Sequence, residues 1–242
     1  MNGNLTIYYR TLHNDLNMPS HNESYLIGIK ELYNFKPHII YDIGSAVLHW
    51  TKLAKRIWPA SEIIAFEAVN EVKEFYDEYG IDYHLDVLSD KDGKEVIFYE
   101  HPIYLGGNSY YKENVHYSKI ANKIYDKDHE IKRTTRTIDS IVKERNFPLP
   151  DMIKIDVQGC ELDILNGMKE TLKNVQHIVV ELQMVEYNIG AKTIEFSIPY
   201  IENLGYKLHP VNLIHKDCRN KYYCGNGPDA DYHFIRKDLA NF

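Results

Sequence analysis

The chain has 242 residues, of which 44% are hydrophobic and 26% are charged, and its formal net charge is -7. This length and apolar content suit one domain with a substantial core, and the acidic balance does not favour a nucleic-acid partner. No run approaches the roughly 18 apolar residues of a membrane span, and MNGNLTIYYR at the amino terminus lacks the apolar core of a signal peptide.

The three cysteines, Cys160, Cys218 and Cys224, form no paired framework. Unpaired thiols are typical of a reducing compartment, so we expect a cytoplasmic protein. The spacing of Cys218 and Cys224 from His215, with His233 further on, matches no compact zinc knuckle. We therefore assign no metal site, and a need for a divalent metal in catalysis stays open.

Short runs rich in Ile and Val alternate with amphipathic segments, which predicts a mostly parallel, doubly wound α/β sheet with helices on both faces. The expected helices cover residues 23–35, 47–58, 70–79, 161–172 and 193–204. Pro199 either interrupts the last of these helices or marks its late start. The strands of the βα succession are expected at residues 38–44, 62–68, 81–89, 152–158 and 177–184, with an antiparallel terminal pair at 206–214 and 231–237.

The remaining segments belong to the middle and the start of the chain. Residues 91–94 predict a hairpin turn into a strand, and residues 133–146 predict an edge strand that leads into a short helix with Asp139 near its start. Residues 114–125 suit another short helix. The segment LGGNSYY, residues 105–111, suits either a plain surface loop or one that closes over a ligand. We expect residues 1–37 to form a cap on the substrate side and residues 38–242 to form the catalytic domain.

Chemistry gathers at the predicted strand ends, where open α/β sheets bind their ligands. Gly44 lets a ligand approach the backbone, an acid at Glu67 can accept both hydroxyls of a ribose, and Asp86 can bond an adenine amino group. Each feature alone also fits a structural turn, but their order favours a nucleoside ligand. The three strand ends are Asp42 to Ser45, Glu67 with Ala68, and Asp86 with Val87.

A nicotinamide cofactor is disfavoured, because no second glycine follows Gly44 in the segment SAVLH. The usual dinucleotide fingerprint needs glycines spaced G-x-G-x-x-G to hold a pyrophosphate. An adenosyl ligand without a pyrophosphate needs no such cradle. The sequence therefore favours an adenosyl ligand over NAD.

The order and spacing of several segments between residues 39 and 184 resemble the FkbM-like methyltransferases. These segments are YDIGSAVLHWTKLA, IIAFEAVNE, LDVLSDKDGKEVIFY, TRTIDSIV, DMIKIDVQGCELDILNGM and HIVVEL. The family comprises S-adenosylmethionine-dependent class I enzymes that commonly methylate hydroxyls of sugars or natural products. The resemblance implies a Rossmann-like fold and an S-adenosylmethionine cofactor.

The resemblance also implies roles for residues at matching positions. Asp156 corresponds to the residue that faces the methionine moiety and the transferred methyl group, and Glu67 to the ribose ligand. The other implied cofactor contacts are the loop residues Asp42, Gly44 and Ser45 and the adenine edge at Asp86 and Val87.

Three residues depart from the family pattern. Ala46 stands where the family usually has asparagine, Leu48 where it has glycine, and Gln158 where it has glutamate. We expect Leu48 to crowd the helix packing or the methionine tail. Gln158 removes a charge but keeps the capacity for hydrogen bonds.

A sugar hydroxyl is a poor nucleophile, so a general base should help to remove its proton. We expect Asp156 to orient the acceptor or take its proton, with Glu181 as a second carboxylate and His49 within reach of the acceptor. For Asp156, Glu181 and His49 alike, the alternative is an ordinary structural role. Lys154 shares a strand face with Asp156, which suits a structural ion pair, and Glu161 suits the first turn of a helix.

The sequence thus predicts an S-adenosylmethionine-dependent O-methyltransferase that acts on a hydroxyl of a sugar, nucleotide sugar or glycan. One alternative is N-methylation of an amino sugar. Another is a binding module that kept the fold and lost catalysis, motivated by Ala46 and Leu48. The expected partner is a small-molecule or glycan acceptor, and a homo-oligomer is left open.

Overall fold

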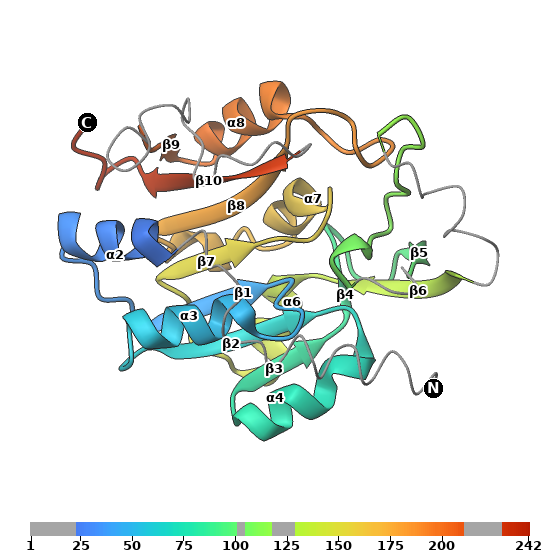
Figure 1. Cartoon of the computed structure of the whole chain (residues 1–242), viewed down its shortest axis with the longest axis horizontal. Coiled ribbons are helices and arrows are strands. Elements are labelled where there is room, and N and C mark those ends of the chain that lie inside the picture. The colour runs from blue at the N-terminus through green and yellow to red at the C-terminus, as the bar shows by residue number, and fades with distance from the viewer. Residues whose placement is uncertain (1–22, 101–104, 118–128, 211–228) are drawn as a thin grey trace.

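The computed structural model describes residues 23–100, 105–117, 129–210 and 229–242, which form a seven-stranded sheet, a three-stranded sheet and flanking helices (Figure 1). The large sheet has the strand order β3-β2-β1-β7-β8-β10-β9. Its strands are β1 (Ile39–Ile43), β2 (Glu62–Glu67), β3 (Asp82–Leu85), β7 (Met152–Ile155), β8 (His177–Gln183), β9 (Tyr206–Leu208) and β10 (Asp229–Arg236). The predicted mostly parallel α/β sheet is confirmed.

The centre of this sheet is β1, which pairs in parallel with β2 on one side and with β7 on the other. The chain thus builds outward from β1 in both directions, so the strand order reverses between β1 and β7. Ligands of open α/β sheets bind beyond the carboxyl ends of the strands at such a switch point. At the far edge, β10 runs antiparallel to both β8 and β9, which confirms the predicted terminal antiparallel pair.

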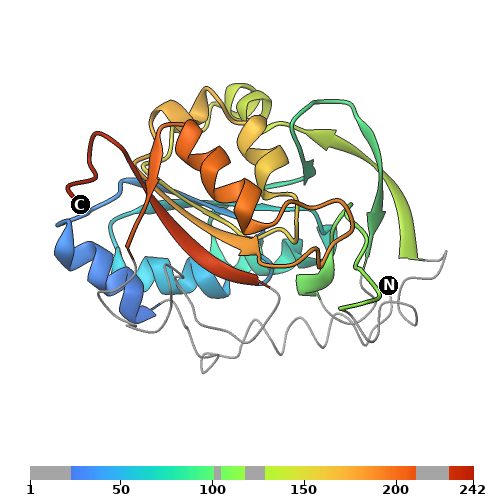
Figure 2. The same ribbon diagram turned by 90° about the horizontal axis from the view of Figure 1, so that it is seen from above.

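Helices cover both faces of the sheet (Figure 2). Alternation along β1 explains the two layers, because Ile40 packs with α2 and α3 while Tyr41 packs with α6, α7 and α8. The short α4 extends the first layer over β2. The helices are α2 (Glu23–Leu32), α3 (His49–Ile57), α4 (Lys73–Tyr79), α6 (Ile138–Arg145), α7 (Glu161–Asn166) and α8 (Ile194–Asn203).

Several helix boundaries differ from the predicted ones. The helix expected from residue 161 to 172 ends at Asn166, because Gly167 packs so closely that an added Cβ would lie 2.1 Å from the Ser89 carbonyl oxygen. A separate 3-10 turn, η4 (Thr171–Lys173), follows. Pro199 lies inside α8 without ending it.

The first helices also differ slightly from their predicted bounds. The segment predicted as a helix over residues 70–79 consists of the 3-10 turn η1 (Asn70–Val72) and α4, and it ends at Gly80 as predicted. Helix α2 ends at Leu32 rather than at residue 35. Helix α3 begins two residues later than predicted, at His49.

The small sheet contradicts two predictions. Its strands are β4 (Val87–Leu88), β5 (Glu95–Tyr99) and β6 (Glu130–Arg136), in the order β4-β6-β5. Since β6 lies between β4 and β5, residues 91–94 do not join a hairpin and β6 is not an edge strand.

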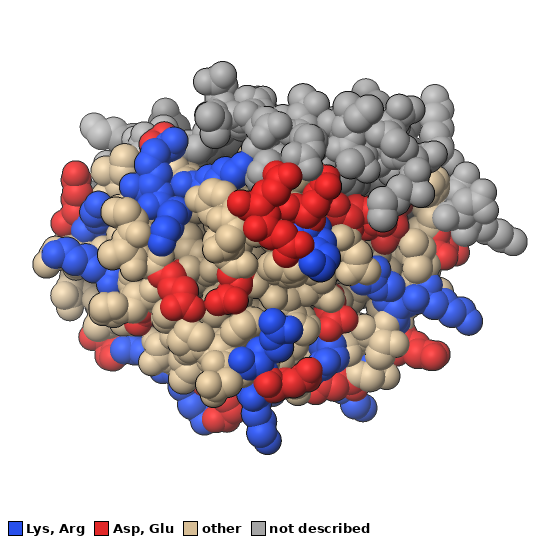
Figure 3. Space-filling view, turned by 90° about the horizontal axis from the view of Figure 1, so that it is seen from below, with Lys and Arg blue, Asp and Glu red and all other residues tan. Residues whose placement is uncertain are grey.

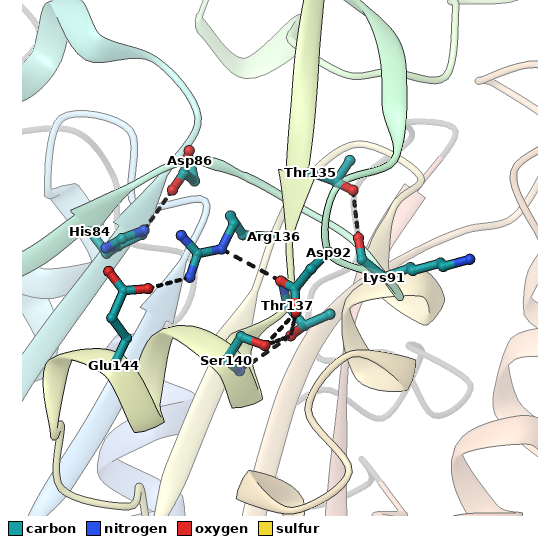
Figure 4. Close-up of polar contacts among 9 residues, drawn as sticks. All are labelled: His84, Asp86, Lys91, Asp92, Thr135, Arg136, Thr137, Ser140 and Glu144. Carbon is teal, nitrogen blue, oxygen red and sulfur yellow. Dashed lines mark hydrogen bonds and ion pairs between the residues drawn. The ribbon is translucent and has the colours of Figure 1, made fainter.

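A polar network around Asp92 explains this arrangement (Figure 4). The Asp92 carboxylate accepts hydrogen bonds from the Thr137 backbone N–H at 2.8 Å and from the Ser140 hydroxyl, both at the start of α6. The Thr135 hydroxyl donates to the Lys91 carbonyl oxygen at 2.6 Å. These bonds attach the turn at residues 91–94 to the end of β6, so the turn does not pair β5 with β4.

Some predictions fall outside the described residues, wholly or in part. The predicted cap at residues 1–37 is described only from Glu23, where α2 packs on α3 and the sheet, so its boundary stays a prediction. Of the helix predicted at 114–125, only residues 114–117 are described, and they form a turn. Within the described part of the chain, no helix has the length and apolar character to cross a membrane.

Candidate active site

A cavity of about 310 Å³ opens at the carboxyl edge of the parallel strands, beside the switch point between β1 and β7. The ends of β1, β2, β7 and β8 and the start of β4 all contribute to its wall. Its volume lies in the range of small-molecule sites, which is about 300–1,000 Å³.

The loop after β1 is held in place by a close approach to β7. A Cβ atom added to Gly44 would lie 1.9 Å from the carbonyl oxygen of Asp156, and Gly44 has a φ of +79°. Only glycine therefore allows these two strand ends to meet. The backbone N–H groups of Gly44 and Ser45 both donate to the carbonyl oxygen of Phe66, at 2.9 and 3.2 Å, which joins the loop to β2.

Tyr76 of α4 supports the same loop, a role that the sequence analysis missed. Its hydroxyl donates to the carbonyl oxygen of Ala46 at 2.8 Å and lies 2.8 Å from the hydroxyl oxygen of Ser45. The signal in the sequence is weak, because a buried tyrosine on a helix is usual in any core.

Two of the residues that depart from the family pattern lie in this loop, with backbone conformations that glycine or asparagine adopts more readily. Ala46 has a φ of 46° and Leu48 a φ of 69°. Leu48 is fully buried and packs with residues of α4, including Phe75, so it does not line the cavity. The Leu48 side chain, which was expected to crowd the helix packing, is therefore accommodated beside α4.

Glu67 lies at the end of β2 and lines the cavity, as predicted for a ribose ligand. Burial raises the pKa of its carboxyl, and three backbone N–H groups offset part of that effect. One carboxylate oxygen accepts from Ala68 and Val69 at 2.7 and 3.2 Å, and the other accepts from Ala46 at 2.9 Å. The second oxygen retains capacity for a ligand hydroxyl.

The predicted adenine edge also lies at the cavity. Asp86 and Val87 both line it, and Val87 continues into an apolar wall with Leu88 and Phe98. The Asp86 carboxylate is 2.7 Å from the Nε2 atom of His84, which fixes its position (Figure 4). An apolar wall beside an acid suits a flat base with an amino group.

Asp42, in contrast, is not part of the cavity lining. Alternation along β1 directs its side chain under α3, where its carboxylate accepts a hydrogen bond from the Thr51 hydroxyl at 2.5 Å. Burial raises the pKa of Asp42 to about 6. Its described contacts join β1 to α3, and the cofactor role that the resemblance implies for it stays a prediction.

Asp156 lies just past the end of β7 and lines the cavity. The Nζ atom of Lys154 is 2.9 Å from its carboxylate, which confirms the predicted ion pair, and 3.4 Å from the carboxylate of Asp231. Burial raises the pKa of Asp156, but the Lys154 ammonium and a hydrogen bond with Glu181 together hold that pKa below its ordinary value. Asp156 is therefore ionised at neutral pH.

Glu181 faces Asp156 from the neighbouring strand β8 and also lines the cavity. Burial raises its pKa well above the ordinary value, and the charge of Asp156 raises it further. The side-chain amide of Gln158 donates to the Glu181 carboxylate at 2.8 Å. Gln158 is the third departure from the family pattern. Its backbone has a φ of 56°, and its side chain gives Glu181 an uncharged hydrogen-bond donor.

His49, the third predicted catalytic residue, and Glu161, predicted in the first turn of a helix, lie in different surroundings. His49 lines the cavity as the first residue of α3. Glu161 is outside the lining and accepts a hydrogen bond from the Gly159 backbone N–H at 2.8 Å, which confirms its place in the first helical turn. Burial raises the pKa of Glu161 to about 7.

The loop at residues 105–111 contributes to the cavity wall through Gly106, Asn108, Ser109 and Tyr110. The hydroxyls of Tyr110 and Tyr111 both donate to the Asp163 carboxylate of α7, at 2.8 and 2.9 Å. The loop therefore closes one side of the cavity and is anchored to α7, so it is not a plain surface loop.

No group of three or more His, Cys, Asp or Glu side chains suited to a metal is found in the described ranges. Of the four residues considered for zinc, His215, Cys218 and Cys224 lie outside the described residues. The fourth, His233, is buried against Tyr25 and His177.

The fold and the cavity together define an open α/β protein with a small-molecule-sized cavity at its switch point. The methyltransferase FkbM domain matches residues 38–208. The chain therefore belongs to the FkbM methyltransferase domain family.

Individual relatives are distant. The chain is 36% identical over 64 residues to the hexuronic acid methyltransferase AglP of Haloferax volcanii, a match that covers 26% of this chain and 27% of AglP. It is 25% identical over 176 residues to Methyltransferase 1 of Beauveria bassiana, which covers 64% of this chain and 70% of that protein. A methyltransferase FkbM structure from Methylobacillus flagellatus KT has a TM-score of 0.52 at 12% identity, covers 95% of this chain and 58% of its own, and supports the fold.

Proposed function

We propose that the protein is an S-adenosylmethionine-dependent O-methyltransferase that acts on a hydroxyl of a sugar, nucleotide sugar or glycan. The observation that carries the proposal is the pairing of two sites in one cavity. Glu67, a carboxylate suited to ribose hydroxyls, and an apolar wall lie at one end, and two facing carboxylates, Asp156 and Glu181, lie at the other. Membership of the FkbM family supports the reaction class.

The described residues fit the proposed cofactor. Gly44 lines the cavity, Glu67 retains an oxygen for a ribose hydroxyl, and Asp86 with Val87 borders the apolar wall. When bound, S-adenosylmethionine supplies an electrophilic methyl group on a positively charged sulfur. Positioning an acceptor hydroxyl behind that methyl group can provide much of the rate.

The protein's own part in the reaction is to orient the hydroxyl and take up its proton. The ionised Asp156 accepts a hydrogen bond from the acceptor hydroxyl, because Lys154 holds its carboxylate in one position at 2.9 Å. As the new oxygen–carbon bond forms, the hydroxyl proton passes to the Asp156–Glu181 pair. His49 lies in the same wall and is proposed to contact the acceptor.

The carboxylate pair predicts how the rate depends on pH. With one proton on Glu181 the pair is a weak base, and loss of that proton makes it a stronger one. We expect kcat to rise as pH increases through the raised pKa of the pair. In Glu181→Gln this rise should disappear, since glutamine does not titrate.

Labelled S-adenosylmethionine with a panel of sugars, nucleotide sugars and glycans, followed by mass spectrometry, tests the function. Methyl transfer to a sugar oxygen is the expected result. Transfer to RNA but to no sugar would overturn the substrate class. Calorimetry with S-adenosylmethionine and S-adenosylhomocysteine tests the cofactor, and no binding of either would leave a binding module that has lost catalysis.

The proposed partner is a small molecule or glycan rather than a nucleic acid. On the face drawn in Figure 3, Lys and Arg are interspersed with Asp and Glu, whereas a nucleic-acid footprint is a continuous basic surface. The free, buried thiol of Cys160 supports the proposed cytoplasmic location.

A further inference from the structure

Arg133 of β6 connects the small sheet to the wall of the cavity. The small sheet lies beside the carboxyl ends of the parallel strands (Figure 1). From β6, the Nη2 atom of Arg133 donates a hydrogen bond to the carbonyl oxygen of Ala68 at 2.7 Å. Ala68 lines the cavity directly after the end of β2, so this bond holds a wall residue from outside the cavity.

The same guanidinium lies over an aromatic ring of the wall. The Cζ atom of Arg133 is 5.6 Å from the centroid of the Phe98 ring, and Phe98 lines the cavity from β5. A cation over a ring face attracts the ring beyond the apolar contact. Arg133 does not line the cavity itself, so it influences a ligand through Ala68 and Phe98 rather than by direct contact.

The Arg133 side chain is well placed to hold two groups at once. It is 20% exposed, and its Nη1 atom lies 3.8 Å from the carboxylate of Glu100, just after β5. The register of the small sheet places Arg133 opposite Val96 of β5. A guanidinium is planar and presents its donors in a rigid fork, so it can bond a carbonyl oxygen while its plane covers a ring.

The bond to Ala68 also bears on the carboxylate of Glu67. The Ala68 carbonyl belongs to the same peptide group as the N–H of Val69, which donates to Glu67 at 3.2 Å. The Ala68 N–H donates to the same carboxylate oxygen at 2.7 Å. Because a peptide group is planar, a bond that holds its carbonyl oxygen also orients its N–H. Arg133 therefore helps to orient Glu67 from the far side of the wall.

We propose, on the basis of the S-adenosylmethionine-dependent function above, that Arg133 is a positioning residue for the nucleoside end of the cofactor. It holds the peptide group that orients Glu67 toward the ribose hydroxyls. It also holds the Phe98 ring in the apolar wall beside the base. The small sheet thereby takes part in cofactor binding, although its strands lie outside the parallel sheet that carries Glu67.

Calorimetric titration with S-adenosylhomocysteine tests this role. Arg133→Met keeps the apolar stem but removes the charged donor, so we expect binding to weaken by about 10-fold. Arg145→Met is the matched control and should stay within about 2-fold of the parent protein. The Arg145 guanidinium lies 5.5 Å from the ring of Phe147, and neither of these residues lines the cavity.

A ribose-specific measurement separates positioning from a general loss of structure. Adenosine and 2′-deoxyadenosine are titrated in competition with S-adenosylhomocysteine. In the parent we expect adenosine to bind about 10-fold more tightly, because it has the hydroxyl that Glu67 accepts, and in Arg133→Met this preference should fall to about 3-fold or less. Should Arg133→Met fail to fold, Arg133→Lys provides the second test. It keeps the charge but not the fork, so we expect a loss of about 3-fold in affinity for S-adenosylhomocysteine.

The outcomes separate this inference from the proposed function. Equal affinities of Arg133→Met and the parent, an equal loss in Arg145→Met, or an unchanged preference for adenosine would overturn the inference and leave the proposed methyltransferase standing. Weaker binding with a reduced preference, but without methyl transfer to any sugar, supports the inference and overturns the proposed reaction. Absence of binding of both S-adenosylmethionine and S-adenosylhomocysteine to the parent would overturn both.

Discussion

The two ends of the β8–β10 ladder bury polar side chains in opposite ways. At one end Glu181 lies opposite Asp231, next to the cavity and to the Asp156 carboxylate. At the other end His177 contacts His233, with 2.9 Å between Nδ1 and Nε2. Both ends belong to the same sheet face, covered by the helical layer of α2 and α3.

The histidine end satisfies its polar groups internally. The Tyr25 hydroxyl of α2 lies 2.9 Å from Nδ1 of His209 and 3.0 Å from Nδ1 of His233. Burial lowers the pKa of His177 to about 3 and that of His209 to about 4, so these rings are neutral at pH 7. Neutral partners in a continuous chain hold the fold together without needing a ligand.

The comparison shows how one ladder serves two purposes. Around Tyr25, buried polar groups hydrogen-bond to one another and so hold α2 on the sheet. Around Lys154, where carboxylates gather beside the cavity, the same sheet borders the candidate site instead.

The largest expected effect is on catalysis at the acidic end. Asp156→Asn keeps the shape of the side chain but removes the charge that accepts the hydroxyl proton. We expect kcat to fall by about 100-fold or more, measured by single-turnover transfer from labelled S-adenosylmethionine. Asp82→Asn, an exposed residue at the start of β3, is the control. A change of less than about 3-fold in Asp156→Asn would remove Asp156 from this role.

Removal of Lys154 should reduce stability. Lys154→Met leaves the part-exposed Asp156 carboxylate and the more buried Asp231 carboxylate without this cation, so we expect the free energy of unfolding in urea to fall by about 2–3 kcal/mol. Lys73→Met, which breaks the exposed pair with Asp77, should leave the midpoint unchanged. A loss below about 1 kcal/mol for Lys154→Met would show that protonation of the carboxylates replaces the Lys154 ammonium.

His177 at the histidine end of the ladder and Glu161 in α7, outside the ladder, should change the stability with pH in opposite directions. His177 has a folded pKa of about 3 against 6.5 in the unfolded chain, so its contribution is full above pH 6.5 and is lost as pH falls below it. Glu161 has a folded pKa of about 7 against 4.5, so its contribution is full below pH 4.5 and is lost as pH rises through 7.

Unfolding free energies between pH 5 and 7.5 test these signs. In this range unfolding takes up close to one proton at His177 and releases close to one at Glu161. His177→Gln should therefore make the stability rise less with pH, and Glu161→Gln should make it fall less with pH. One proton corresponds to about 1.4 kcal/mol per pH unit for each group, an upper bound. Identical slopes in both variants and the parent would contradict the comparison.

A smaller effect is expected from the support of the cofactor loop. Tyr76→Phe removes the hydroxyl that bonds Ala46 and Ser45, which should weaken S-adenosylhomocysteine binding by about 5–10-fold in calorimetry. Tyr83→Phe removes a hydroxyl that bonds the exposed Asp77 and serves as the control. Equal affinities for the two variants would show that the loop holds its shape without Tyr76.

The smallest effect concerns backbone strain in the same loop. Ala46→Asn places a residue that tolerates left-handed backbone at a φ of 46°. We expect a gain of about 0.5 kcal/mol, seen as a rise of about 1–2 °C in Tm by calorimetric unfolding. A lower Tm would show that the Ala46 methyl group contributes packing that outweighs the strain.

Much of the architecture followed from local patterns. Apolar strands that end in Asp42, Glu67 and Asp156 predicted the parallel sheet and its ligand edge, because such runs are buried on both faces and their carboxyl ends meet at one edge. The small sheet was not predictable in this way. Lys91 to Lys94 has the composition of a hairpin turn, yet the bonds of Asp92 to Thr137 and Ser140 come from residues more than forty positions later.

In the candidate site, too, some features could be predicted from local sequence and others were set by packing. Residue type and order indicated Glu67 and Asp86, and the family resemblance indicated Asp156, as groups that lie at one cavity, since strand ends impose their positions. Whether a carboxylate faces the cavity or supports it depends on packing, so Asp42 lies under α3 and Glu181 faces Asp156 only once β8 pairs with β7. The meeting of carboxylates at the acidic end depends on three strands together, and so the tertiary structure alone could disclose it.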